Sequence, residues 1–150
     1  TDKKTFDNKL YKNKFISSKG KLPLPVNGKL KTSFGEIGKL GAKSKGIVIE
    51  TIPKASVISP YEGEIVFAAP FRNYGNLLII SYGNGYHILL SGMESIDGNV
   101  GKWIMAGEPV GKMGKIKRDE TPELYMELRK NGEPINPKKW IAFNHMKVRG

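Results

Sequence analysis

The sequence predicts a single antiparallel all-β domain. Glycine and proline recur at turn spacing from Gly20 onward, and the short runs between them are rich in β-branched and aromatic residues. No internal repeat of about 20–50 residues is evident, so a solenoid or propeller is not expected. A chain of 150 residues is long enough for one domain with its own apolar core.

The expected strands follow one another in short intervals along the chain. They are predicted at residues 46–51, 55–59, 64–69, 77–82, 86–91 and 123–129. The three residues Gly83, Asn84 and Gly85 separate two of these runs. Residues of this kind tolerate the positive φ that tight turns require, so a β-hairpin is predicted there.

The chain divides into a lead-in, a domain and a tail. Residues 1–19 are polar and rich in lysine and are predicted to form a helical or linker segment. The β domain is expected over residues 20–141, with a C-terminal tail over 142–150. The apolar residues of the lead-in are spaced roughly as one helical stripe: Phe6, Leu10, Tyr11 and Phe15. Trp140 is expected to anchor the end of the domain.

Composition excludes several classes of protein. With 26% charged and 39% hydrophobic residues, the chain has the composition of an ordinary globular domain. Its longest apolar runs are far shorter than the roughly 20 residues that span a bilayer, so no transmembrane segment is predicted. The absence of cysteine excludes disulfides and thiolate zinc sites. The chain begins at Thr1 without an apolar leader, and we expect it to be part of a longer protein.

The net charge of +11 is concentrated at one end of the chain. Residues 1–45 carry a balance of +9, whereas residues 46–150 carry only +2. Such a segment could be a solvated linker or could attract nucleic acid, an anionic membrane, a cell-wall polymer or an acidic protein. Only four of the 25 basic residues are arginine, the residue best suited to bidentate phosphate and base contacts. The sequence also has no recognisable nucleic-acid-binding pattern. No nucleic-acid partner is therefore predicted.

The residues needed for hydrolysis are scarce. The two histidines of the chain are His87, on a predicted strand, and His145, in the tail. A catalytic zinc usually needs three protein ligands, and two distant histidines would have to find help. Glu120, Glu123 and Glu127 cluster near the last strand, and we interpret them as a solvated edge rather than a glycosidase pair. No metal and no cofactor are predicted.

Several segments taken together resemble one known family. Residues 45–49 are similar to an H-x-G-I-D-I segment, and 123–127 occupy the place of H-L-H-F-E. The other matching segments are residues 19–26, 33–35, 57–66, 74–76, 82–86 and 106–114, with 129–132 and 136–137 continuing the pattern. Together they resemble a LytM-type domain, the lysostaphin-like zinc endopeptidase of duplicated-hybrid-motif fold. The resemblance covers about residues 20–141.

The departures from this family fall on its catalytic positions. In active members the His and Asp of H-x-x-x-D and the second His of H-x-H bind zinc, and the matching positions here are Ser44, Val48 and Tyr125. Two further histidines assist the chemistry, and they correspond to Gly92 and Glu123. Valine cannot ligate zinc, and without ligands no bound water is activated. The resemblance therefore implies a degenerate peptidase homologue that is not an enzyme.

His87 is not expected to replace a lost ligand. We expect the groove-facing residues of its strand to be Tyr86, Ile88 and Leu90. Because successive side chains of a strand point to opposite faces, His87 is predicted to face away from the groove.

The pattern resembles the EnvC-type degenerate LytM factors. Those periplasmic division proteins activate N-acetylmuramoyl-L-alanine amidases, which hydrolyse peptidoglycan. The resemblance implies a periplasmic location, a cell-wall amidase as partner, and a vacated groove that binds the amidase's regulatory helix. The expected partner-binding residues are Lys45, Val48, Tyr74, Tyr125 and Arg129. Each also has a purely structural interpretation, as a sheet residue, a loop cap or a solvated charge.

Two other functions remain open at this point. The domain could bind peptidoglycan without an amidase partner, using the old substrate cleft and its basic lead-in. It could also be a residual metallo-endopeptidase with unusual ligands.

Overall fold

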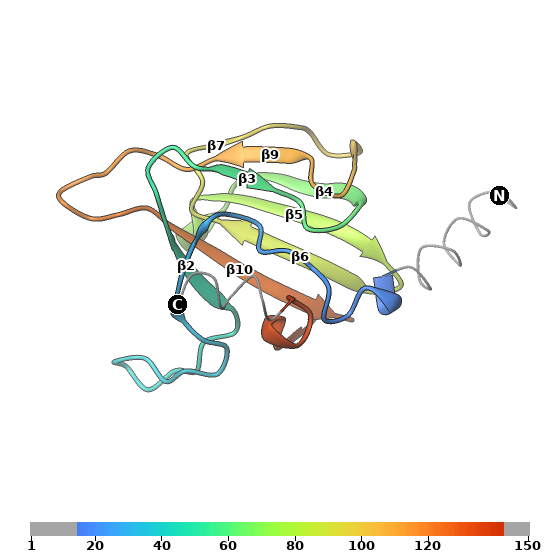
Figure 1. Ribbon diagram of the computed structural model, residues 1–150, viewed down its shortest axis with the longest axis horizontal. Coiled ribbons are helices and arrows are strands. Elements are labelled where there is room, and N and C mark those ends of the chain that lie inside the picture. Colours follow the sequence, from blue (N-terminus) through green and yellow to red (C-terminus); the bar gives the residue numbers. More distant parts are fainter. Residues whose placement is uncertain (1–14, 143–150) are drawn as a thin grey trace, which may run out of the picture.

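The computed structural model describes residues 15–142, which form two antiparallel β-sheets (Figure 1). The large sheet has the strand order β1-β2-β10-β6-β5-β4-β8, and β11 also pairs with β10. Its strands are β1 (Gly28–Thr32), β2 (Ile47–Thr51), β4 (Gly63–Pro70), β5 (Asn76–Gly83), β6 (Tyr86–Ser91), β8 (Trp103–Ile104), β10 (Glu123–Lys130) and β11 (Glu133–Ile135). The all-β fold class is therefore confirmed.

A small sheet covers one face of the large one. It has the order β3-β9-β7, with β3 (Ser56–Ile58), β9 (Pro109–Lys112) and β7 (Ser95–Ile96). The apolar core includes residues of both sheets, such as Ile80 and Leu90 from the large sheet and Val57 and Val110 from the small one. Two short 3-10 helices, η1 (Arg72–Tyr74) and η2 (Pro137–Lys139), complete the fold. Within the described residues, no helix is long and apolar enough to cross a bilayer.

All six predicted strands are present, with ends that differ by a few residues at most. The predicted hairpin joins β5 to β6, and Asn84 and Gly85 have φ of 52° and 83°. Positive φ at both central residues is the geometry of a type I′ turn, whose twist matches that of the flanking strands.

The end of the lead-in packs into the domain. Phe15 is completely buried, and its ring stacks on Trp140 with 4.7 Å between centroids. It also contacts Tyr61, Tyr82 and Tyr86. Of the remaining lead-in stripe, Phe6, Leu10 and Tyr11 lie outside the described residues, as does the tail beyond Ala142.

Candidate functional site

The predicted site lies on the face of the large sheet opposite the small sheet. Tyr125 on β10 is directly opposite Val48 on β2 and Ser91 on β6. Residues paired in this way share one face of a sheet. The neighbouring residues Ile47, Leu124 and Leu90 are completely buried in the core, so Val48, Tyr125 and Ser91 point to the other face.

A shallow groove of about 340 Å³, which we call the central groove, opens on this face. It is lined by Val48, Asn73, Tyr74, Ser91, Gly92, Glu123 and Tyr125. Four of the five positions predicted to be former metal or catalytic positions therefore meet in one place, together with the predicted partner-binding residue Tyr74. The strand pairing β2-β10-β6 brings them together from segments that are far apart in the sequence.

A second hollow of about 440 Å³ adjoins the central groove and shares Tyr74 and Tyr125 with it. We call it the side hollow, and Ser44 and Lys45 contribute to its wall. The structure thus places four predicted partner-binding residues and all five of those positions along two adjoining hollows. Arg129 lines neither of them and acts through a neighbour instead.

That neighbour is Glu127, whose carboxylate is buried on the groove face of β10. Its side chain is only 1% exposed, and its two oxygens accept hydrogen bonds from the Tyr125 hydroxyl at 2.5 Å and from Arg129 Nε at 2.7 Å. Arg129 Nη1 also donates to the Gly132 carbonyl at 3.2 Å. Our interpretation of Glu127 as part of a solvated edge was therefore wrong. Burial first, and then the hydrogen bond to Glu127, raises the pKa of Tyr125.

An aromatic row continues from Tyr125 across the sheet. The Tyr125 and Tyr74 rings have centroids 6.3 Å apart, and Tyr74 lies 6.2 Å from Phe71. Phe71 in turn meets Phe67 of β4 edge to face, at 5.7 Å. The Arg72 guanidinium lies over the Phe71 ring, 5.3 Å from its centroid. Phe71 is 38% exposed, so this row offers accessible apolar surface beside the central groove.

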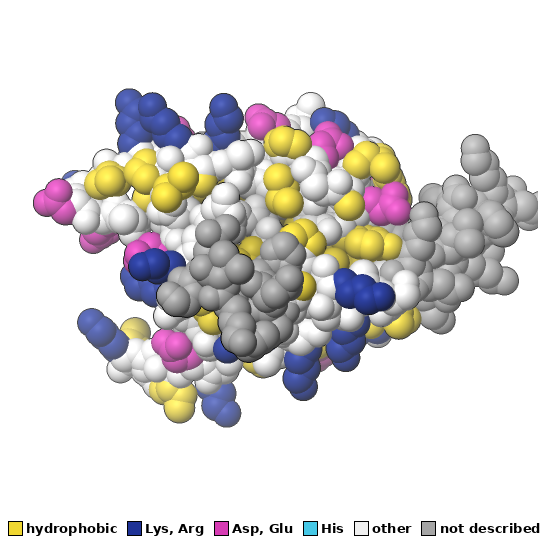
Figure 2. All heavy atoms as spheres, viewed as in Figure 1, with side chains coloured by type: hydrophobic (Ala, Val, Ile, Leu, Met, Phe, Trp, Pro, Cys, Tyr) yellow, Lys and Arg dark blue, Asp and Glu magenta, His cyan; other side chains and the backbone are white. Residues whose placement is uncertain are grey.

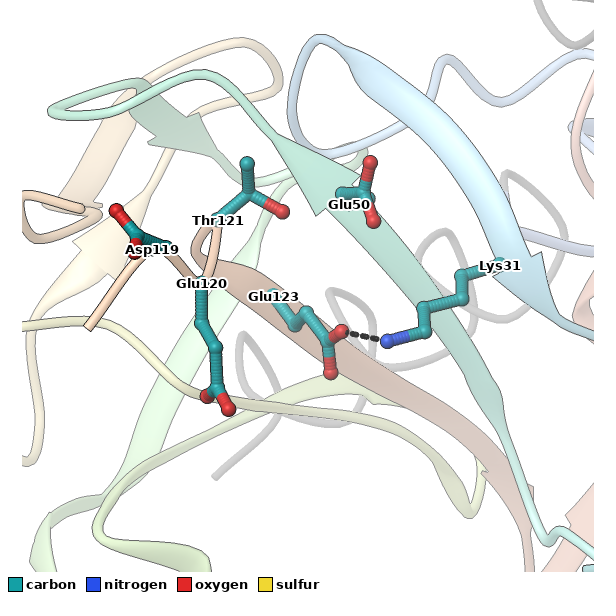
Figure 3. A pocket seen from close by; sticks show the side chains of 6 residues that line it. All are labelled: Lys31, Glu50, Asp119, Glu120, Thr121 and Glu123. Carbon is teal, nitrogen blue, oxygen red and sulfur yellow. Dashed lines mark hydrogen bonds and ion pairs between the residues drawn. The ribbon is translucent and has the colours of Figure 1, made fainter. Parts of the chain in front are cut away.

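The other end of the central groove is acidic. Figure 3 shows Glu123 paired with Lys31 of β1 in a hollow that Glu50, Asp119 and Glu120 also line. The hydrogen bond to Glu123, followed by its charge, raises the pKa of Lys31. Glu123, at the position of an assisting histidine, is thus engaged by a cation.

Gly92, at the position of the second assisting histidine, has no room for a side chain. Its φ is +106°, and a Cβ added there would lie 2.2 Å from the Glu123 carbonyl oxygen. Real Cβ atoms do not approach an oxygen this closely. A histidine at this position would require the backbone of β6 and β10 to separate.

His87 lies on the groove face, contrary to the prediction. It pairs with Arg129 and Ser81, whereas Ile88 and Leu90 are completely buried in the core. Ser91 lies four positions further along β6, which is about 13 Å along a strand. His87 therefore does not reach the Val48–Tyr125 position. His145 lies outside the described residues.

The side chains at the three predicted zinc positions, Ser44, Val48 and Tyr125, do not fit a zinc ion. Val48 offers no donor atom, and the Tyr125 hydroxyl is already donated to Glu127. The Ser44 hydroxyl donates to the Gly46 carbonyl at 2.7 Å. Among residues 15–142, no three His, Cys, Asp or Glu side chains are grouped so that they could hold a metal ion.

Comparison with known proteins identifies the family of this domain. The family model described as "Peptidase family M23" matches residues 42–137. The chain belongs to peptidase family M23. The match includes β2 through β11, and hence every residue of the central groove.

Two curated relatives of this chain differ in their named activities. The "Murein hydrolase activator EnvC" of Escherichia coli is 28% identical over 118 residues, which cover 79% of this chain and 28% of EnvC. The "DD-carboxypeptidase/endopeptidase Mpg" of Neisseria meningitidis is 37% identical over 79 residues, covering 51% of this chain and 17% of Mpg. This chain therefore spans less than a third of each relative. The solution structure of lysostaphin superposes with a TM-score of 0.66 at 18% identity, covering 87% of this chain and 56% of that one, and it confirms the lysostaphin-like fold.

Proposed function

We propose that this M23 domain is a non-catalytic activator of periplasmic N-acetylmuramoyl-L-alanine amidases in cell division. It binds the amidase through the central groove and the side hollow. The observation that carries the proposal is the pairing of Val48 with Tyr125 at the family's zinc position. An apolar side chain and a phenol engaged with Glu127 form a contact surface there instead of a ligand set.

The chemistry of the groove suits a protein segment. Tyr74 and Tyr125 supply rigid aromatic area, Val48 an apolar floor, and Lys45 of the side hollow a charge, while Arg129 acts through its pair with Glu127. Aromatic residues and arginine are enriched among interface hot spots, and an amphipathic helix uses such a groove. The similarity to the murein hydrolase activator EnvC supports an activator role. The similarity to Mpg makes a peptidase the competing function, and direct peptidoglycan binding is the third.

Release of dye from labelled peptidoglycan sacculi separates these functions. The reactions contain this domain alone, a division amidase from the same organism alone, and the two together. Strong release only in the mixture supports the activator. Release by the domain alone, abolished by a chelator, would make it a peptidase. Sedimentation of the domain with sacculi, without any activation of the amidase, would make it a wall-binding module.

Two variants test the binding surface. Tyr125→Ala and Lys45→Glu should reduce activation at least about tenfold, because a central contact is typically worth more than about 1.4 kcal/mol. Lys138→Glu on η2 makes the same charge change at an exposed site outside both hollows and should leave activation unchanged. Urea unfolding of each variant establishes that the domain is still folded. Normal activation by both groove variants would contradict the proposed surface.

A further inference from the structure

The loop between β1 and β2 forms an ordered hairpin that stands out from the sheet at the lower left of Figure 1. We call residues 35–44 the rim hairpin. Ile37 and Lys43 form an antiparallel bridge, and Gly38 N donates to the Ala42 carbonyl at 2.9 Å. Further backbone hydrogen bonds join Gly35 to Ser44 and Ser44 to Glu36. Backbone hydrogen bonds therefore run along the length of the hairpin.

Its large apolar side chains are left in solvent. Leu40 is 99% exposed and Ile37 is 66% exposed. Leu40 is the most exposed of the large apolar side chains among residues 15–142. These two side chains, three residues apart on one ordered hairpin, leave apolar surface available for contact with another molecule.

The rim hairpin is also cationic. Lys39, Lys43 and the adjoining Lys45 stand against Glu36, and none of the three lysines forms an ion pair within residues 15–142. Glu36 is partly engaged, because its carboxylate accepts a hydrogen bond from Ser33 N. Figure 2 shows hydrophobic and basic side chains next to one another on this protruding part of the surface.

The rim hairpin and the groove share one wall. Gly38, Ala42 and Lys43 line the side hollow together with Tyr74 and Tyr125. A segment bound over Tyr125 therefore passes directly beside the hairpin. At its other end the central groove reaches Glu123, which also lines the neighbouring hollow with Glu50, Asp119, Glu120 and a single cation, Lys31. The two ends of this surface therefore differ in charge.

We propose that the rim hairpin is a second contact for the bound partner, and that it recognises an amphipathic helix with carboxylates at the end nearest the hairpin. The proposal rests on the proposed function, since the helix belongs to the activated amidase. Leu40 and Ile37 contact the apolar stripe of the helix, while Lys39 and Lys43 pair with its acidic residues. Such charge complementarity fixes the direction in which a segment lies in the groove.

Binding to the amidase of the same organism, measured by titration calorimetry, tests the apolar contact. The double variant Ile37→Ser/Leu40→Ser should bind about tenfold or more weakly than the unmodified domain. Val100→Ser removes an apolar side chain that is 64% exposed and outside the hollows, and it should bind normally. All of these side chains are exposed, so the urea midpoints should stay unchanged.

If the unmodified domain binds the amidase and the double variant binds equally well, the hairpin proposal is overturned while the proposed function stands. No binding by the unmodified domain would instead remove the proposed function itself.

Two further measurements test the chemistry of the partner. Raising NaCl from about 50 to about 300 mM should weaken binding, and Lys39→Gln/Lys43→Gln should reduce this dependence on salt. Affinity that does not depend on salt would overturn the acidic helix. A photo-crosslinking residue in place of Leu40 should attach to a predicted helix of the amidase that carries Asp or Glu near the cross-link. Attachment to a basic or non-helical segment would overturn it as well.

Discussion

The Tyr125 hydroxyl donates a hydrogen bond to a carboxylate two residues along the same strand, that of Glu127, at 2.5 Å. Both side chains lie on the groove face of β10, where Arg129 completes the network. A buried carboxylate is costly unless it is paired and hydrogen-bonded. The network therefore holds the Tyr125 ring in place beneath any bound segment.

Glu127 and Arg129 differ in exposure. Removing one of them should therefore lower the free energy of unfolding more than removing the other. Arg129→Met leaves the nearly inaccessible Glu127 carboxylate without its cation, so unfolding should become easier by about 2–4 kcal/mol. Glu127→Gln leaves Arg129, whose side chain is 27% exposed, free to hydrate, and should cost about 1–2 kcal/mol. Urea unfolding measures both. Glu108→Gln, which breaks the more exposed pair with Lys102, is the control and should have a much smaller effect. A larger loss for Glu127→Gln than for Arg129→Met would contradict this assignment.

Alkaline pH should destabilise the domain through two tyrosines. Burial raises the pKa of both Tyr82 and Tyr125 in the folded state. Below pH of about 10 both are protonated in the folded and unfolded chains, so they add no pH dependence. Above it the unfolded chain loses these protons first, and the free energy of unfolding falls as pH rises. Absorbance at 295 nm should show a step on alkaline unfolding that includes the ionisation of Tyr82 and Tyr125.

The variant Tyr125→Phe provides the comparison for this titration. It should reduce the unfolding-linked absorbance step by the contribution of one tyrosine, since the Tyr125 hydroxyl is gone. A Tyr125 that ionises in the folded domain near pH 10 would contradict its burial and its hydrogen bond to Glu127.

Gly92 should tolerate no side chain. Gly92→Ala combines a positive φ with a Cβ placed 2.2 Å from a carbonyl oxygen. Gly101 has a similar φ of +96° but no atom within 4 Å of an added Cβ, so Gly101→Ala isolates the cost of the backbone conformation, about 1–2 kcal/mol. Urea unfolding should show a clearly larger loss for Gly92→Ala. Equal losses would mean that the close approach of β6 and β10 relaxes freely.

Restoring the family's ligand types should create zinc binding. In the triple variant Ser44→His/Val48→Asp/Tyr125→His, three donors converge where none did before, so about one zinc per chain should remain after gel filtration. The matched variant with Tyr125→Phe in place of Tyr125→His lacks the third ligand and should retain much less. Metal analysis of the three proteins settles the comparison. Stoichiometric zinc in the unmodified domain would contradict its proposed lack of catalysis.

The longer strands could be predicted because each contains its own pattern. β4, β5 and β6 are runs with several β-branched and aromatic residues bounded by turn residues, and β10 alternates the apolar Leu124, Met126 and Leu128 with other residues. β7 and β8 have two residues each, and β9 and β11 contain proline or glycine. Such short segments become strands only because a neighbour pairs with them, and sequence patterns do not reveal that neighbour.

The site was predictable in its positions but not in its contacts. Motif spacing identified Val48 and Tyr125, which the sheet places opposite each other. The error at His87 arose from choosing the wrong face, although Ile88 and Leu90 form the more apolar of the two alternating sets and were the better candidates for the core. The burial of Glu127 depends on Tyr125 and Arg129 covering it in three dimensions. A carboxylate in a charged stretch is usually solvated, so sequence alone predicted the opposite.

Phe15 has a mechanical consequence. Its ring is enclosed by Trp140, Tyr61, Tyr82 and Tyr86, on the side of the sheet away from Tyr125. A pull on the chain that precedes Phe15 is borne by this aromatic socket before it reaches any strand. The force therefore acts on the face of the sheet away from the groove. A version of the domain that begins at Gly20 lacks Phe15. The aromatic rings of the socket would then be uncovered, and the domain would be prone to aggregate.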